Sequence, residues 1–213
     1  MRALKTLFNL PRILRVRKQL LADSDAAWAA RIGARALHID GRTLHPRGQG
    51  YIEFLRLMRA PVEQWTVAGM RSAFEMGAKN FGGHAIAGVS TEALHITLPG
   101  RTLAARKYLP TAHTEELVSA ILFFHGGGFV IGSIETHDRL CRYLAAAFGG
   151  PVISVDYRLA PEHPYPAAIE DCITAYRALL EEVNPSSLVV AGDSAGGGAA
   201  LATVVALRDA GDP

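Results

Sequence analysis

The sequence predicts an α/β fold in which helices cover both faces of a mostly parallel sheet. Two observations lead to this prediction. Apolar, strand-like runs alternate with helical runs between residues 117 and 210, and a glycine-rich stretch directly follows two of those runs. Strands that are apolar throughout are typical of parallel sheets buried on both sides. The composition agrees, because 49% of the 213 residues are hydrophobic and 20% are charged, which favours a globular chain.

Residues 1–90 are assigned to an N-terminal helical segment, because their apolar residues recur at helical spacing. Tyr51–Arg59 and Glu63–Lys79 are the clearest predicted helices, with Pro61 between them and Gly82-Gly83 closing the segment.

Residues 91–213 are assigned to the α/β domain. It opens with a predicted antiparallel hairpin around a Pro99-Gly100 turn, and three strand–helix units follow. The hairpin strands are Ala93–Leu98 and Thr102–Leu109; the later strands are Leu117–Phe124, Pro151–Asp156 and Ser187–Ala191; the helices are His137–Phe148, Ala167–Val183 and Ser194–Ala210.

Charge and cysteine content exclude several classes of protein. Twenty-two Lys and Arg against 20 Asp and Glu give a net charge of +2, which argues against nucleic-acid binding by bulk basicity. Cys141 and Cys172 have no partners at metal or redox spacing, so buried reduced thiols are favoured over a disulfide. We therefore expect a cytoplasmic protein without a metal site.

The first 22 residues are basic and partly apolar, with six Lys or Arg before the first acid at Asp23. Such a stretch fits a membrane surface or a place on its own domain. We favour the second, and expect Pro11 to interrupt a continuous helix. The uncharged run of residues 117–134 is long enough to span a bilayer, but His125 and three glycines in its middle argue against that.

The strongest chemical signal is Gly192-Asp193-Ser194-Ala195-Gly196, placed between an apolar strand and a helical run. G-x-S-x-G alone is a weak pattern, and a serine on an ordinary glycine-rich loop also fits it. The strand–turn–helix setting favours a nucleophile elbow, in which small neighbours allow a tight turn and present the serine hydroxyl at the sheet edge.

The second signal is His125-Gly126-Gly127-Gly128-Phe129, directly after a buried strand. Consecutive glycines can aim backbone amides at the oxyanion formed during acyl transfer. A phosphate-cradling loop is the alternative, but no Lys-Ser/Thr follows and the glycine spacing differs from a dinucleotide fingerprint. We expect His125 to hold the loop rather than to transfer protons.

The third signal is residues 156–168, DYRLAPEHPYPAA, a strand end followed by a proline-rich loop. A structural role is favoured here, in which Arg158 and Glu162 brace the loop as an ion pair.

Together, HGGGF, YRLAPEHPYPAA and GDSAGG resemble the hormone-sensitive-lipase-like family of α/β-hydrolases, which are bacterial carboxylesterases and lipases. The resemblance covers residue 94 onward, and residues 1–90 match loosely as a cap segment. It implies an α/β-hydrolase fold, a small-molecule ester substrate and no cofactor. It makes Ser194 the nucleophile and places Gly126, Gly127, Gly128 and Ala195 in the oxyanion hole, where Gly126 supports the loop and the other three supply amides. His125, Asp193, Arg158 and Glu162 would support the loops.

The catalytic base and its acid are not found where this family places them. Nineteen residues follow Ser194 and none is a histidine; Asp209 and Asp212 come at the far end of the helix after the elbow. We therefore expect a C-terminally truncated fragment, with a bare edge on strand Ser187–Ala191 and almost no activity on its own. A ligand-binding homologue without turnover, as in the plant gibberellin receptors, and a non-functional remnant are the alternatives.

Overall fold

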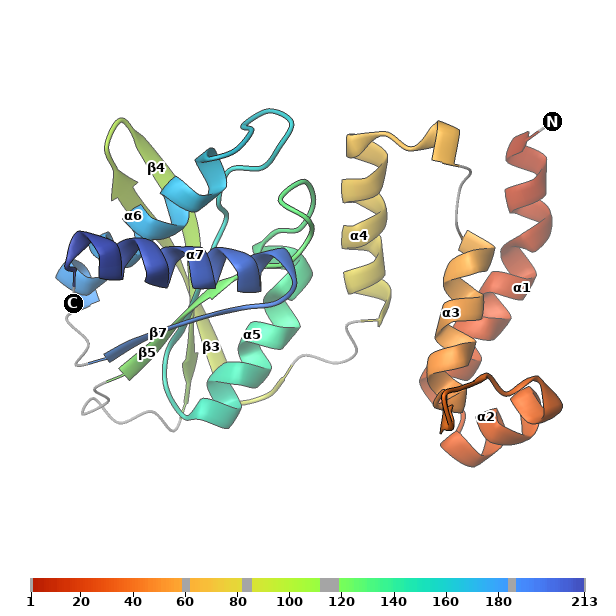
Figure 1. The fold of residues 1–213 in the computed structure, drawn as a ribbon. Coiled ribbons are helices and arrows are strands. Elements are labelled where there is room, and N and C mark those ends of the chain that lie inside the picture. Colours follow the sequence, from red (N-terminus) through yellow and green to blue (C-terminus); the bar gives the residue numbers. More distant parts are fainter. Residues whose placement is uncertain (1, 59–61, 82–85, 112–118, 184–186, 213) are drawn as a thin grey trace. The chain divides into compact units, whose positions relative to one another are not determined.

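The computed structural model describes residues 2–58, 62–81, 86–111, 119–183 and 187–212. The chain forms two compact units, Met1–Trp65 and Thr66–Pro213 (Figure 1). This division comes before helix α4 (Val67–Phe81), whereas the sequence placed a domain boundary at residue 90. The second unit includes α4 because Arg71 on this helix hydrogen-bonds to the carbonyl of Val130 and the carboxylate of Glu162.

The first unit is helical, and its small core gathers around Trp28. The indole Nε1 donates to the carbonyl of Gln19 at 3.2 Å, and Leu20, Ile32 and Phe54 are buried with it. The elements are α1 (Arg2–Ala22), α2 (Asp25–Ile32), the 3-10 turn η1 (Gly33–Arg35), the hairpin strands β1 (His38–Ile39) and β2 (Arg42–Thr43), and α3 (Pro46–Met58).

Two expectations for the helical segment are corrected by the structure. α1 continues through Pro11. The proline removes one helical hydrogen bond, but the strong helix formers Leu, Arg and Lys on both sides of it favour the helix. The helix expected from Glu63 begins at Val67, after the 3-10 turn η2 (Val62–Gln64). Thr66 caps it, since its hydroxyl accepts the amide of Gly69 at 3.0 Å. Pro61 and Gly82-Gly83 lie outside the described residues.

The second unit contains a mixed sheet in the order β3-β4-β6-β5-β7. The predicted hairpin is confirmed: β3 (Val89–Leu98) pairs antiparallel with β4 (Arg101–Pro110). β4 also pairs antiparallel with β6 (Val152–Val155). β5 (Ser119–Phe124) lies between β6 and β7 (Ser187–Gly192) and is parallel to both, as the sequence predicts.

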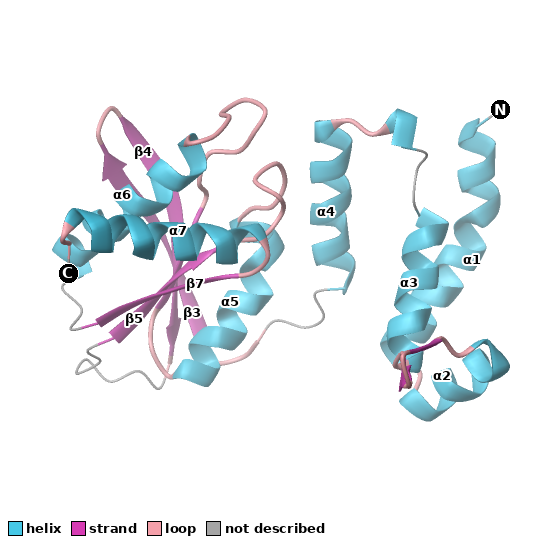
Figure 2. Cartoon of the chain, in the orientation of Figure 1, coloured by secondary structure: helices cyan, strands magenta, loops and turns pink. Residues whose placement is uncertain are grey.

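Helices cover both faces of this sheet (Figure 2). α6 (Ala167–Val183) and α7 (Ala195–Ala210) pack on one face with Leu122, Phe124 and Ile153 in a large core. α5 (Ile134–Phe148) packs on the other face, where Cys141 and Ala145 meet Phe123 and Val152. Alternate residues of β5 therefore face opposite cores, which explains its unbroken apolar sequence.

β7 is the last strand of the sheet, and within the described part of the chain it pairs with β5 alone. Val189 on β7 is 48% exposed, and Leu201, Val204 and Val205 on α7 are 67%, 50% and 38% exposed. Among the described strands, one edge of β7 therefore has no partner, and β7 and α7 both carry exposed apolar side chains. None of the described helices is long and apolar enough to cross a membrane.

Candidate functional site

Ser194 occupies the sharp turn that joins β7 to α7. Its φ is 52°, in the left-handed region that non-glycine residues seldom adopt, and it lies exposed at the start of the helix. The flanking glycines allow this turn. A Cβ on Gly192 would lie 2.4 Å from the carbonyl carbon of Gly196, and one on Gly196 would lie 2.0 Å from the oxygen of Phe124. The backbone therefore has the geometry expected of a nucleophile elbow.

The glycine-rich loop after β5 is joined to this elbow by Asp193. The amide of Gly126 donates to Asp193 Oδ1 at 2.8 Å. Gly127 and Gly128 follow with φ of 130° and 64°, and their amides donate to no acceptor among the described residues. Ala195 begins α7, where first-turn amides have no intrahelical acceptor. The two motifs thus bring free backbone donors to the same end of the sheet as Ser194.

His125 holds the loop from inside the protein. It is 1% exposed, its ring stacks on Tyr157 with centroids 4.3 Å apart, and its Nδ1 lies 2.9 Å from the carbonyl oxygen of Gly126. The Tyr157 hydroxyl donates to the carbonyl of His125. Burial lowers the pKa of His125 to about 4, with a smaller contribution from His137, so its ring is neutral at pH 7.

His137 on α5 is a contributor that sequence reasoning missed. It is 7% exposed, its Nε2 lies 3.1 Å from Asp193 Oδ1, and its ring stacks on that of His125 at 5.6 Å. The same Asp193 oxygen therefore meets both the Gly126 amide and this imidazole. The available signal was its spacing, since His137, Cys141 and Ala145 form the buried stripe of an amphipathic helix.

The ion pair expected between Arg158 and Glu162 is wrong. Arg158 pairs with Asp171 at 2.9 Å and with Glu170 at 3.2 Å. Asp171 is fully buried and also pairs with Arg101. Burial alone would raise the pKa of Asp171, but the hydrogen bonds from Arg158 and Arg101 outweigh it and lower that pKa.

Glu162 pairs instead with Arg71 of α4, in a bidentate contact at 2.7 and 2.8 Å. This hydrogen-bonded pair lowers the pKa of Glu162 to about 2. Arg71 also donates to the carbonyls of Val130 and Ala160, so it joins the glycine loop to the proline-rich loop. Because α4 is distant in sequence from both loops, pattern reading within the DYRLAPEHP stretch did not reveal this partner.

A shallow cavity of about 410 Å³ lies beside these loops. Its lining includes Arg71, His125, Asp156 and Tyr157, but not Ser194. Cys141 and Cys172 are free and buried, as predicted, and burial raises the pKa of the Cys141 thiol to about 12. Among the described residues, no group of three or more His, Cys, Asp or Glu is placed to hold a metal ion.

Comparison with known proteins shows which proteins this chain resembles. Residues 121–213 match the family model of the α/β-hydrolase fold. The chain has an α/β-hydrolase fold. Esterase LipI of Mycobacterium tuberculosis is 45% identical over 126 residues, and ethyl acetate hydrolase of Pseudomonas putida is 44% identical over 116 residues. These alignments cover 56% and 52% of this chain.

Solved structures give the same result. An esterase of Pyrobaculum calidifontis superimposes with a TM-score of 0.66 and 37% identity, over 76% of this chain and 54% of that one. An esterase of the bacterial hormone-sensitive lipase family superimposes with a TM-score of 0.64 and 36% identity, over 73% of this chain and 50% of that one. The resemblance noted in the sequence is confirmed. The chain spans 39% of the length of LipI, 36% of the ethyl acetate hydrolase and about half of these solved esterases.

Proposed function

We propose that this chain is part of an esterase, which hydrolyses carboxylic esters through an acyl-enzyme formed on Ser194. The observation that carries the proposal is the strained elbow at Ser194, joined through Asp193 to a loop with free amides. A hydroxyl held on a tight turn can attack an ester carbonyl, and preorganised amides stabilise the negative charge that develops on the carbonyl oxygen.

The roles follow the geometry. Gly127, Gly128 and Ala195 donate to the oxyanion, and Gly126, His125 and Asp193 keep those donors in place. Arg158 and Glu162 support the proline-rich loop through Asp171 and Arg71 rather than through each other. We keep residues 1–90 as the proposed cap segment. The similarity to the ethyl acetate hydrolase favours short acyl chains.

The general base is not found at the place where an α/β-hydrolase usually carries it. None of the nineteen residues after Ser194 is a histidine, and His125 is buried and bonded to the loop. Loss of the base from a serine triad lowers kcat by roughly a millionfold in subtilisin. We therefore expect turnover by the 213-residue chain to stay near background.

Covalent labelling tests Ser194 without requiring turnover. The folded chain is incubated with a fluorophosphonate, and the adduct is located by mass spectrometry beside Ser194→Ala and a circular-dichroism melt. Slow labelling confined to Ser194 is expected, because the serine has no base at the usual place, and labelling at another residue of the folded chain instead would overturn the assignment. Hydrolysis of p-nitrophenyl butyrate that disappears in Ser194→Ala would instead show that the chain holds a base we have not identified.

A further inference from the structure

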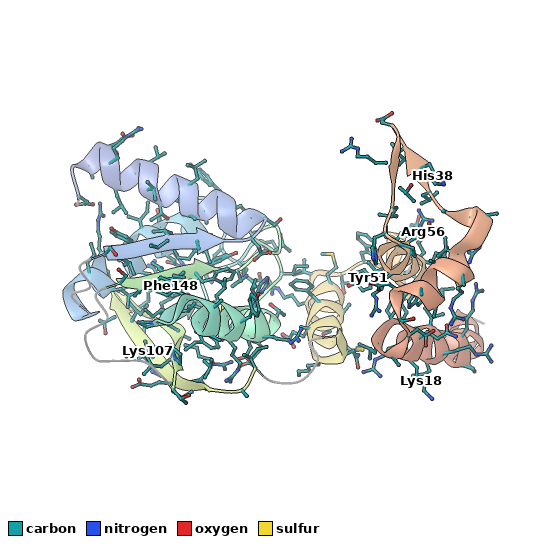
Figure 3. The ribbon with its side chains drawn as sticks, turned by 90° about the horizontal axis from the view of Figure 1, so that it is seen from below. Lys18, His38, Tyr51, Arg56, Lys107 and Phe148 are labelled. Atoms are coloured by element: carbon teal, nitrogen blue, oxygen red, sulfur yellow. The ribbon has the colours of Figure 1, made fainter. Side chains whose placement is uncertain are left out.

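The first unit contains a pocket at the junction of α1, α2 and α3 that the proposed esterase chemistry does not use. Its volume is about 310 Å³, and four arginines line it: Arg12 from α1, Arg31 from α2, Arg35 from the turn after it, and Arg56 from α3. Figure 3 labels Arg56 on α3, and Lys18 on the side of α1 turned away from α3. The four arginines of the lining therefore come from three helices and one turn of the same unit.

Two of these four charges are already compensated. Arg31 pairs with Asp23 at 2.5 Å, and Arg35 pairs with Glu53 at 3.1 Å. Arg12 and Arg56 have neither a hydrogen bond nor an ion pair with any described residue. The pocket consequently holds two guanidinium groups whose charge and donors are unmatched.

Trp28 and Gly50 form a tightly packed part of the pocket wall. Trp28 is 2% exposed and lines it with Gly50, where an added Cβ would lie 2.3 Å from the indole ring. Arg31 lies over the same indole, 5.4 Å from its centroid, which fixes one guanidinium at the wall. Gly50 and Arg31 therefore cover the indole, and the half-buried apolar side chains that a ligand would meet beside the arginines and Glu53 are those of Val16 and Leu57.

The charge of the whole unit favours an anion at this place. Residues 1–65 contain 12 Lys and Arg against 5 Asp and Glu, whereas residues 66–213 contain 10 against 15. The first unit thus carries an excess of seven positive charges within a chain whose net charge is only +2. Such a field raises the local concentration of anions around the pocket.

We propose that this pocket binds a phosphate monoester whose organic part contacts Val16 and Leu57. Guanidinium groups match phosphate oxygens with paired hydrogen bonds. A phosphate monoester carries about −1.5 to −2 charges at pH 7, which balances the two unmatched arginines, whereas a carboxylate would balance one. The volume is at the lower end of small-ligand sites, which begin at about 300 Å³. A soluble organophosphate and the headgroup of phosphatidic acid share this chemistry.

Calorimetric titration of the 213-residue chain with phenyl phosphate, at low salt and pH 7.5, tests the proposal. Saturable binding is expected, weakened roughly tenfold or more by Arg12→Gln or Arg56→Gln, since each removes a charged hydrogen-bonding partner. Arg56→Lys keeps the charge but loses the planar donor pair, so an intermediate loss is expected. Circular dichroism of each variant checks that these exposed substitutions leave the fold intact.

Arg15→Gln is the matched control, because it removes one charge from an exposed position of α1 that does not line the pocket. It should change the affinity less than twofold; a loss equal to that of Arg12→Gln would reduce the effect to net charge and overturn the site. Absence of saturable binding to both phenyl phosphate and phosphatidic acid vesicles would also overturn it. Binding to vesicles alone would assign the ligand to a lipid, and binding of phenyl phosphate without vesicle binding to a soluble compound.

Discussion

Two regions next to β7 differ in how closely they are packed. The elbow region, comprising residues 124–128 and 192–196, is held by close backbone packing and by the contacts of Asp193 with Gly126 and His137. The outer α7 face, comprising Leu201, Val204 and Val205, is apolar and exposed. Substitutions in the first region should cost stability, and substitutions in the second should change association. The elbow region therefore contributes to the stability of the described fold, whereas the outer α7 face is an apolar surface that the described residues leave exposed.

The largest effect is expected from Gly196→Ala in the elbow region. The new Cβ would lie 2.0 Å from the backbone oxygen of Phe124, which cannot move without shifting β5. Overpacking against backbone should lower the free energy of unfolding by about 3 kcal/mol or more. Urea denaturation followed by circular dichroism measures it.

Gly198→Ala is the control for that substitution, since it is on the same helix and a Cβ there meets nothing within 4 Å. Alanine in an exposed helical position should raise stability by about 0.5–1 kcal/mol. Equal losses in the two variants would contradict the close packing of the elbow region.

Asp171→Asn should give the next largest loss. The Asp171 carboxylate is fully buried and pairs with Arg158 and Arg101, so removing its charge leaves both arginines without their central partner. Breaking a buried pair in this way costs about 3 kcal/mol. Glu170→Gln is the comparison, because Glu170 is 57% exposed and bonds the same Arg158. Its loss should stay below about 1 kcal/mol, and similar values for the two would show that burial of Asp171 adds little.

The buried His125 predicts a third effect, on pH dependence. Its folded pKa of about 4 lies below the ordinary value of 6.5, so the unfolded chain binds more protons between these values. The stability that neutral His125 contributes is present above pH 6.5 and is lost as the pH falls toward 4. Between pH 7 and pH 5 the loss should be about 2 kcal/mol.

Denaturation at both pH values, compared between the unmodified chain and His125→Phe, isolates this contribution. His163→Gln is the control, because that histidine is exposed. The pH dependence should shrink in His125→Phe and persist in His163→Gln. Unchanged pH dependence in His125→Phe would show that His125 titrates alike in the folded and unfolded chain.

The elbow region was largely predictable from sequence, because Gly192, Ser194 and Gly196 encode backbone geometry locally, and so were the strands and helices of the second unit. The partners of Arg158 and Glu162 were not. Asp171 and Arg71 reach them from a later helix and from a segment assigned to the cap, so their proximity depends on tertiary packing. His137 was missed for a related reason. A histidine on the buried side of a helix is interpreted as a core residue from sequence alone, and its contact with Asp193 appears only in the structure.

The smallest effect on stability is expected at the outer α7 face, where Leu201→Glu changes a side chain that is 67% exposed. The free energy of unfolding should shift by less than about 0.5 kcal/mol, as for other exposed positions. Self-association should nevertheless fall, because exposed apolar side chains on α7 and the edge strand β7 favour contact between chains. Sedimentation velocity over a range of concentrations measures this, with Arg208→Glu on the same helix as a charge-changing control. Equal association in Leu201→Glu and the unmodified chain would show that the outer α7 face is not the surface through which chains associate.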